Sequence, residues 1–294
     1  MSADPTVTVT AFAAERTRLL GIAYRMLGSR ADAEDVLQDA WLRWSESDSS
    51  DVRSTQAWLT TIVTRLSIDR LRSAKAQREV YIGPWLPEPL ADIDPVTPES
   101  KAEMASDLSL AFLSLLERLG PDERAAFVLH DAFDCDYDDI ADVLGKSAAA
   151  CRQLVHRARE RIVAERRRFQ VDEQTRRHML ERFIAAAGTG DLPAMKALFA
   201  TDARLVTDGG GKAVAVRRIL HGAERIGLLF KMIFQRNAQS IERRIVRING
   251  ELGLATSFRG KLHSVTTIDT DGQRIYGYYS VANPDKLGAF LPAA

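Results

Sequence analysis

The spacing of apolar residues changes along this chain and predicts two kinds of domain. Through most of the first 200 residues the apolar positions recur every three or four residues, which is typical of amphipathic helices. Further on they alternate with polar positions, as expected for strands, and Asp271-Gly272 is a hairpin signal. The expected strands span 204–207, 213–217, 241–248, 252–258, 265–270 and 274–281. We therefore expect helical bundles followed by an α+β domain with a curved antiparallel sheet.

Residues 1–73 are predicted to form a first bundle of three helices. The opening helix stops near Gly28-Ser29, and Asp32 is a candidate N-cap for the second. The second helix turns one apolar face inward, made of Leu37, Trp41 and Trp44. A polar loop over 45–54 precedes the third helix, whose inward positions are Leu59, Ile62, Val63 and Leu66 and whose outward positions are Arg65, Arg70 and Arg72.

The start of the third helix carries residue types that suit single-stranded nucleic acid. Trp58 follows the polar loop, where an aromatic ring can support an unstacked base. Thr60, Thr61 and Thr64 supply short hydroxyls for phosphate contacts. A Trp buried in the bundle core is the alternative interpretation.

Residues 107–170 are predicted to form a second bundle that contains a helix-turn-helix over 137–161. Gly145 can end the first helix, and Ser147 is a good N-cap for the next, in which Ala150, Leu154 and Ala158 face inward. Acidic residues crowd the first helix, and arginines crowd the second, up to Arg168. An ordinary helical hairpin is the alternative, but this separation of charge favours a helix that enters the major groove of DNA.

Residues 74–106 are predicted to be a linker, because five prolines interrupt any helix and the charged residues are mostly acidic. About 30 residues can extend to roughly 100 Å, more than one and a half turns of duplex DNA. The segment WLPEP at 85–89 contains a Trp and a Leu, which favours a docking segment over a passive tether.

Composition limits the class of protein. With 46% hydrophobic and 27% charged residues, the chain is expected to fold into two or three domains. The formal net charge is zero, so nucleic-acid affinity must come from local charge asymmetry. We see no signal peptide, no membrane span and no metal-ligand spacing around Cys135 and Cys151, and we expect a cytoplasmic protein with reduced cysteines.

Three stretches resemble a known family. DAEDVLQDAWLRW, AWLTTIVTRLSIDRLRS and the run from Glu123 to Ile162 are similar to regions 2 and 4 of extracytoplasmic-function (ECF) sigma factors of bacterial RNA polymerase. Residues 171–294 resemble a SnoaL-like cone of the cystatin-like/NTF2-like fold. WLPEP, DGGGK at 208–212 and NPDKL at 283–287 resemble three signatures of the subgroup in which such a domain is fused to the sigma factor.

The resemblance implies partners and residue roles. The partners are promoter DNA and core RNA polymerase, through its β′ clamp helices and β flap. Region 2 would bind the polymerase through Asp35, Gln38, Asp39 and Trp41. The −10 element would be held by Trp58, Thr61, Thr64, Arg65 and Arg72. The −35 element would be read by Ser147, Ala149, Ala150, Arg152, Gln153, His156, Arg157 and Arg159.

The fused tail is implied to regulate activity in cis, so that no separate anti-sigma factor is required. The linker would lie along the RNA-exit path of the polymerase. Our hypothesis is that the second and third signatures face the first. The regulatory interface would comprise Trp85, Leu86, Pro87, Glu88, Pro89, Asp208, Gly209, Gly210, Gly211, Lys212, Asn283, Pro284, Asp285, Lys286 and Leu287.

Two other functions compete with this interpretation. A regulator that binds duplex DNA without polymerase would not need the acidic second helix. A tail that is an enzyme would need a catalytic group such as Asp202, Asp208, His221 or His263, but their spacing forms no recognisable pair. We expect no catalysis, no cofactor and no metal. A small-molecule ligand in the cone is a separate expectation, with a lining of Phe230, Phe234, Phe258, Tyr276 and Tyr278.

Overall fold

The computed structural model describes residues 5–47, 52, 54–91, 108–165, 171–237 and 240–291. The chain divides into two compact units, Met1–Glu79 with Leu115–Arg166, and Val80–Ser114 with Arg167–Ala294. The first predicted bundle, and the second from Leu115 onward, therefore belong to the first unit, whereas 108–114, predicted as the start of the second bundle, belong to the second unit. The predicted linker start at residue 74 was wrong, because the preceding helix continues to Glu79. The linker from Val80 to Ala91 groups with the C-terminal domain, and its acidic part over 92–106 and the arginines at 166–168 lie outside the described residues.

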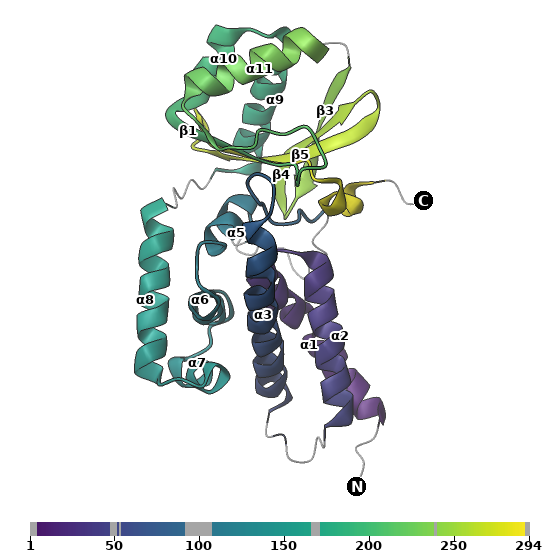
Figure 1. Cartoon of the computed structure of the whole chain (residues 1–294), viewed down its shortest axis with the longest axis vertical. Coiled ribbons are helices and arrows are strands. Elements are labelled where there is room, and N and C mark those ends of the chain that lie inside the picture. Colours follow the sequence, from purple (N-terminus) through teal and green to yellow (C-terminus); the bar gives the residue numbers. More distant parts are fainter. Residues whose placement is uncertain are drawn as a thin grey trace. The chain divides into compact units, whose positions relative to one another are not determined.

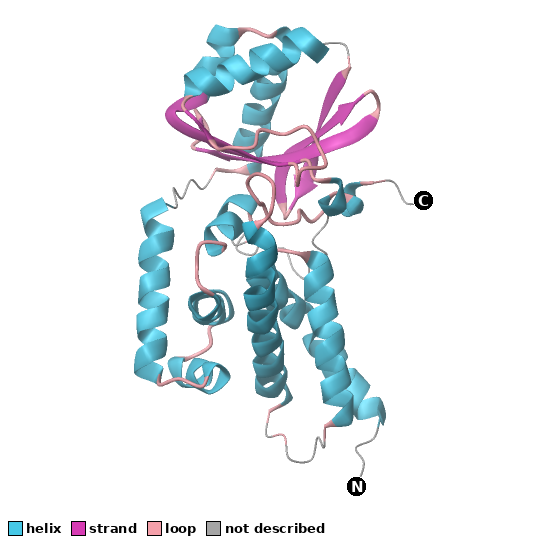
Figure 2. Ribbon diagram, in the orientation of Figure 1, coloured by secondary structure: helices cyan, strands magenta, loops and turns pink. Residues whose placement is uncertain are grey.

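The first unit is all-α, as predicted (Figures 1 and 2). Its helices are α1 (Pro5–Leu27), α2 (Arg30–Glu46), α3 (Thr55–Glu79), α6 (Pro121–Phe133), α7 (Tyr137–Leu144) and α8 (Ala148–Glu165), and α5 (Leu110–Leu116) joins the two units. The N-cap of α2 is Ser29, whose hydroxyl accepts the Asp32 amide at 3.2 Å, so the prediction of Asp32 as the cap was wrong. Asp32 lies in the first turn instead, where a carboxylate also suits the helix dipole.

The two bundles of the first unit pack on each other through arginines. Arg124 of α6 is buried and donates to the Met26 carbonyl and to Glu117, each at 2.6 Å. The guanidinium groups of Arg18 and Arg25 in α1 lie 5.5 and 5.2 Å from the centroid of the Phe133 ring. Cations over an aromatic face bind more strongly when they are desolvated, so these contacts fix α6 against α1.

The second unit is an α+β domain built on a curved sheet (Figure 1). Its helices are α9 (Glu173–Thr189), α10 (Leu192–Leu198) and α11 (Ala223–Asn237). Its strands are β1 (Phe199–Asp208), β2 (Leu220–His221), β3 (Ile241–Ile248), β4 (Glu251–Phe258), β5 (Lys261–Thr270) and β6 (Ile275–Val281), in the order β2-β1-β6-β5-β4-β3. The hairpin at Asp271-Gly272 is confirmed, with Gly272 at a φ of 88°.

Two details of the sheet differ from the sequence prediction. The sheet is mixed, because β1 pairs with β6 in parallel. The chain reaches the far edge of the sheet through the helix α11 between β2 and β3, and this crossover makes the parallel pairing possible. The expected strand over 213–217 is irregular, and only Leu220–His221 pairs with β1. The side chain of Thr207 accounts for part of this, since its hydroxyl bonds both the amide and the carbonyl of Val216 at 2.8 Å.

The sheet has a hydrophobic core on each face, as strand alternation requires. Leu205, Leu254 and Tyr278 face the helices α9–α11. Their neighbours Val206, Ala255 and Tyr279 face the other way. There they pack against Leu86 of the linker, Leu110 of α5, and Leu287. The linker and the C-terminal segment thus complete the second core of this domain.

We expect the sheet to tolerate no side chain at Gly253 of β4. A Cβ there would lie 2.4 Å from the Thr266 carbonyl oxygen and 2.6 Å from Ile248. Gly253→Ala should therefore lower the free energy of unfolding by about 1–3 kcal/mol, measured as a lower thermal midpoint of the full chain. Gly188→Ala in α9 is the control, because nothing lies within 4 Å of its Cβ and a helical Ala should stabilise by up to ~1 kcal/mol. Equal midpoints for the two variants would contradict this packing.

Candidate functional site

The helix-turn-helix of the first unit is formed by local capping, as the sequence predicted. Gly145 ends α7 in the left-handed conformation with a φ of 63°. The Ser147 hydroxyl accepts the Ala150 amide at 3.2 Å and so caps α8. The inward face of α8 differs in one position, because Ala150 is half-buried and Cys151 and Val155 are buried beside Leu154 and Ala158.

The residues predicted to read the −35 element lie along the outer face of α8. The exposed members are Ser147, Ala149, Arg152, Gln153, His156, Arg157 and Arg159, and Ala150 is half-buried. The outer face of α8 carries less unpaired positive charge than the sequence indicated. Arg157 and Arg161 bond to Glu123, and Arg159 bonds to Asp131 at 2.6 Å, both on α6. The arginine side chains of these pairs are about half exposed, whereas Glu123 and Asp131 are 12% and 23% exposed.

The residues predicted to hold the −10 element differ in how far they are buried. Trp58 is half-buried with its ring 5.3 Å from that of Trp44, so it is partly a core residue. Thr61 is half-buried and bonds the Ala57 carbonyl. Thr64 is fully buried, and its hydroxyl has no hydrogen-bond partner among the described residues. The prediction that Thr64 contacts DNA is therefore wrong for this structure, because its position falls on the inward face of α3.

The two arginines of the same set contact the second bundle. Arg65 donates to the carbonyls of Asp142 and Val143 at 2.8 and 2.9 Å, at the C-terminal end of α7. That end carries the negative pole of the helix dipole, which attracts a guanidinium. Arg72 donates to Asp122 at the start of α6 at 3.2 Å. In this structure both predicted DNA contacts are engaged by helices of the second bundle.

The residues predicted to bind core polymerase lie together on α2. Asp35, Gln38 and Asp39 are exposed. Trp41 is half-buried and packs its ring edge-on against Phe12, 5.2 Å between centroids. Asp35 accepts a hydrogen bond from Arg70 of α3 at 2.7 Å, which fixes the orientation of this acidic face. Hydrogen bonding to Asp32, above all, raises the pKa of Arg70 and keeps it cationic.

In the second unit, the three signature segments meet around one buried carboxylate. Asp208 has no exposed surface. Its Oδ1 accepts the Tyr81 hydroxyl at 2.5 Å, and its Oδ2 accepts the Leu86 amide at 2.9 Å. Lys286 completes the set through an Nζ–Oδ2 distance of 2.8 Å. A carboxylate of the second signature therefore binds the linker and the third signature at once.

Lys286 binds the linker by a second route. Its Nζ donates to the Leu86 carbonyl at 2.6 Å and lies 3.9 Å from the centroid of the Trp85 ring. Only 12% of the Lys286 side chain is exposed, so its charge depends on these partners and on Asp208. We call this arrangement of Tyr81, Trp85, Leu86, Asp208 and Lys286 the linker dock.

The glycines of DGGGK give the linker room. Gly210 has a φ of 57°, and a Cβ there would lie 2.4 Å from the Asn283 amide nitrogen. That amide donates to the Tyr81 hydroxyl at 2.9 Å. Burial, with the hydrogen bond to Asp208, raises the pKa of Tyr81, so the phenol keeps its proton for Asp208. Lys212 pairs with Asp285 at the exposed rim.

Asn249 is a functional residue that the sequence analysis missed. It sits in the turn between β3 and β4 with a φ of 53° and is fully buried. Its backbone amide donates to the Leu90 carbonyl at 2.8 Å, and its Oδ1 accepts the Leu90 amide at 2.7 Å. Its Nδ2 donates to the Leu108 carbonyl at 2.7 Å. One side chain thus joins the two ends of segment 91–107. The Asn249-Gly250 pair could have signalled the turn, but no sequence rule predicts its partners.

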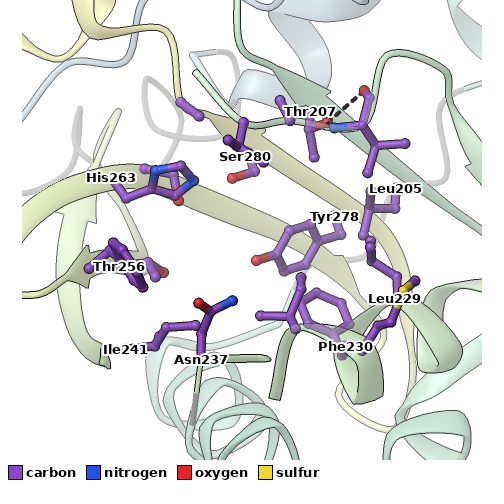
Figure 3. Close-up of a pocket in the computed structure, with 18 of the residues that line it drawn as sticks. Leu205, Thr207, Leu229, Phe230, Asn237, Ile241, Thr256, His263, Tyr278 and Ser280 are labelled. Atoms are coloured by element: carbon purple, nitrogen blue, oxygen red, sulfur yellow. Dashed lines mark hydrogen bonds between the residues drawn. The ribbon is translucent and has the colours of Figure 1, made fainter. Parts of the chain in front are cut away.

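A cavity of about 470 Å³ lies between the concave face of the sheet and α11 (Figure 3). Of the aromatic lining predicted for the cone, Phe230, Phe258 and Tyr278 border the cavity, whereas Phe234 and Tyr276 do not. Tyr276 turns instead to Asp271, to which its hydroxyl donates at 2.9 Å. Figure 3 shows Tyr278, His263, Thr256 and Asn237 around the same space.

Only one of the four catalytic candidates borders this cavity. Asp202 and His221 are exposed elsewhere, and Asp208 belongs to the linker dock. His263 lines the cavity, and burial lowers its pKa, which favours the neutral imidazole. Over the described ranges, no cluster of three or more His, Cys, Asp or Glu side chains is placed to hold a metal. Within those ranges no helix is long and apolar enough to cross a bilayer.

Comparison with known proteins gives the family. Residues 11–77 match the family model "Sigma-70 region 2", and residues 109–162 match "Sigma-70, region 4". The chain is 37% identical over 290 residues to the ECF RNA polymerase sigma factor SigJ of Mycobacterium tuberculosis, covering 95% of this chain and 93% of that protein. It is 34% identical over 221 residues to a probable ECF sigma factor, SigI, of the same species, covering 74% of this chain and 73% of that one.

A solved structure agrees with the sequence match. The crystal structure of Mycobacterium tuberculosis SigJ superposes with a TM-score of 0.77 at 34% identity, covering 96% of this chain and 98% of that one. Both sigma regions and the fused α+β domain are thus present in one relative of nearly the same length. The chain belongs to the ECF RNA polymerase sigma factors, which bind core RNA polymerase and direct it to promoters.

Proposed function

We propose that the C-terminal domain controls this sigma factor in cis by holding its linker. The observation that carries the proposal is the buried carboxylate of Asp208, which takes hydrogen bonds from Tyr81, Leu86 and Lys286. A buried carboxylate without partners is costly, so the linker and the C-terminal segment are bound cooperatively. Control built into the chain would make a separate anti-sigma factor unnecessary.

The dock limits how far the linker can extend. The last helix of region 2, α3, ends at Glu79, and Tyr81 is already bonded. At the other side Leu108 is bonded to Asn249, and α5 begins at Leu110. Because Leu90 is bonded to the same Asn249, the two residues that flank segment 91–107 are held at one side chain, and that segment adds nothing to the distance the linker spans. Only release of the dock lets the whole linker extend.

The sign of control follows from the separation of the two promoter elements. One turn of duplex DNA is about 34–36 Å long, and the linker must span roughly 50 Å if the two bundles are to bind sites one and a half turns apart. A free linker reaches this distance easily, at about 3.3–3.6 Å per residue. The docked linker does not lengthen, so we propose that docking lowers initiation and that release raises it. Coupling energies of about 1–3 kcal/mol are enough for such control.

The same proposal assigns roles in the first unit. The exposed set on α8 reads the −35 element, and Trp58, Thr61, Arg65 and Arg72 hold the −10 element. The acidic face of α2 binds core polymerase, in the cytoplasm. Arg65 and Arg72 must first leave Asp142, Val143 and Asp122, so separation of the two bundles is a step toward promoter binding.

The linker dock and the bond between Asn249 and Leu90 should lose protection separately. Asn249→Gly keeps a residue that suits a φ of 53° but removes the amide that accepts from the Leu90 N–H. Asp208→Asn weakens the acceptor of the Leu86 N–H. In residue-resolved hydrogen exchange of the full chain, the first variant should lower protection mainly at Leu90 and the second mainly at Leu86. Unchanged protection at both amides would contradict the dock as a closed state.

Weakening the dock or the bonds of Asn249 to the linker should raise promoter-specific transcription. Asp208→Asn, Lys286→Met and Asn249→Gly should each increase run-off transcription with purified core RNA polymerase several-fold, as expected for a loss of about 1 kcal/mol or more in coupling. Asp285→Asn is the control, because its pair with Lys212 is exposed on both sides and should leave transcription unchanged.

Each outcome of this assay has a separate meaning. Lower transcription by the dock variants, with an unchanged melting midpoint, would overturn the proposed sign and favour a tail that positions the bundles. Transcription equal to that of the unmodified chain would overturn control through the dock. A charge-removing variant that unfolds is recognised by its melting curve, and Asn249→Gly, which removes no charge, then serves for the assay.

A further inference from the structure

We propose that the cavity of the C-terminal domain binds a small amphipathic monoanion, an apolar body that ends in a carboxylate, with Arg243 of β3 as its counter-ion. The proposal concerns a site separate from the linker dock, since none of the five dock residues lines the cavity. It rests on the volume of the cavity, on the apolar character of most of its wall, and on the charge of its polar part.

The size and wall of the cavity suit an organic ligand. About 470 Å³ falls within the range of roughly 300–1,000 Å³ typical of small-molecule sites. Most of the wall is apolar, with side chains from β1, β3, β4 and α11 such as Leu205, Leu229, Phe230, Ile233, Ile241 and Phe258. Met232 of α11 also lines the cavity although 45% of it is exposed. An apolar body would be removed from water along most of its length.

The polar part of the wall is organised by strand register. Arg243 of β3 pairs with Thr256 of β4, and Thr256 pairs with Ser264 of β5. All three side chains line the cavity, so a guanidinium and two hydroxyls lie in one row across neighbouring strands. Tyr278 adds a phenol from β6 close to Arg243. These groups converge from four strands on one region of the cavity.

The charge of this region has no counterpart in the described structure. The guanidinium of Arg243 makes no hydrogen bond and no ion pair with any described residue, and the neighbouring phenol of Tyr278 carries no charge, because burial raises its pKa. The second cation of the lining, Arg236, is exposed at the end of α11, and the lining includes no Asp or Glu. Burial lowers the pKa of Arg243, but an arginine stays charged at neutral pH. An anionic group on the ligand would supply the missing partner.

The chemistry favours a carboxylate on that ligand. A guanidinium presents a planar fork of N–H donors that matches the two oxygens of a carboxylate. His263 is held as the neutral imidazole by burial and donates to the Val214 carbonyl, so it adds no second charge. A single inward cation surrounded by neutral hydroxyls matches one negative charge better than two.

The test uses three probes with the same apolar body: octanoate, octan-1-ol and octylammonium. Isothermal titration of the full chain should show octanoate binding at least tenfold more tightly than octan-1-ol, and octylammonium binding more weakly than both. Arg243→Met should reduce the affinity for octanoate to that for octan-1-ol and leave the latter within twofold. Arg243→Lys should retain most of the preference, because it keeps the charge.

Two further variants keep the test decisive. Arg244→Met is the matched control, since Arg244 is the next residue of β3, is exposed and does not line the cavity. Thr256→Trp should fill the cavity and abolish binding of both octanoate and octan-1-ol. Arg243→Met should fold, because it removes an unpaired, partly buried charge, and its melting midpoint should be equal or higher. No binding of octanoate by the unmodified chain, or equal binding by Arg243→Met, would overturn the proposal.

Discussion

The attachment of the linker to the C-terminal domain depends on one buried carboxylate. Asp208 ends β1, has no exposed surface, and is surrounded by donors from two segments that lie more than 75 residues away on either side. A charge in that position is tolerated only while all its partners are present. Without their hydrogen bonds nothing offsets the free-energy cost of removing the carboxylate from water. Lys286 has the same dependence, with 12% of its side chain exposed. The pair therefore makes docking of the linker a two-state event, docked or released, in preference to a gradual one.

Apolar burial on the same face of the sheet as the dock supports the same event. Leu86 and Leu110 are almost fully buried in the core that contains Val206 and Val281. Release of the linker would expose part of this core, at about 25 cal/mol for each Å² of apolar surface. In the proposed mechanism, binding to polymerase compensates for that loss before the linker extends, so the buried apolar area sets a threshold for release.

Much of this arrangement could be predicted from the sequence, and the failures have physical causes. Helical spacing and the caps at Gly145 and Ser147 gave the helix-turn-helix, because those signals are local. Periodicity did not distinguish the cap at Ser29 from Asp32, since both residue types suit either position. The parallel pairing of β1 with β6 and the bonds of Asn249 to Leu90 and Leu108 join residues far apart in the chain, and no local pattern encodes such partners. The three signatures could be brought together only by resemblance, and the charge of the cavity became visible only once strand register was known.

The dock and the cavity use opposite faces of the same strands. Along β1, Thr207 lines the cavity and the next residue, Asp208, belongs to the dock. At the end of β6, Ser280 and the following Ala282 line the cavity, whereas Val281 between them faces the core beneath the linker. Strand alternation keeps the two sets of side chains separate, while the backbone between them is shared, as in the bond from the Ala282 amide to the Asp208 carbonyl at 2.7 Å. A substitution in one set therefore leaves the side chains of the other in place. Control by the dock and occupancy of the cavity can for this reason be separated by mutation, and each proposal can be tested independently of the other.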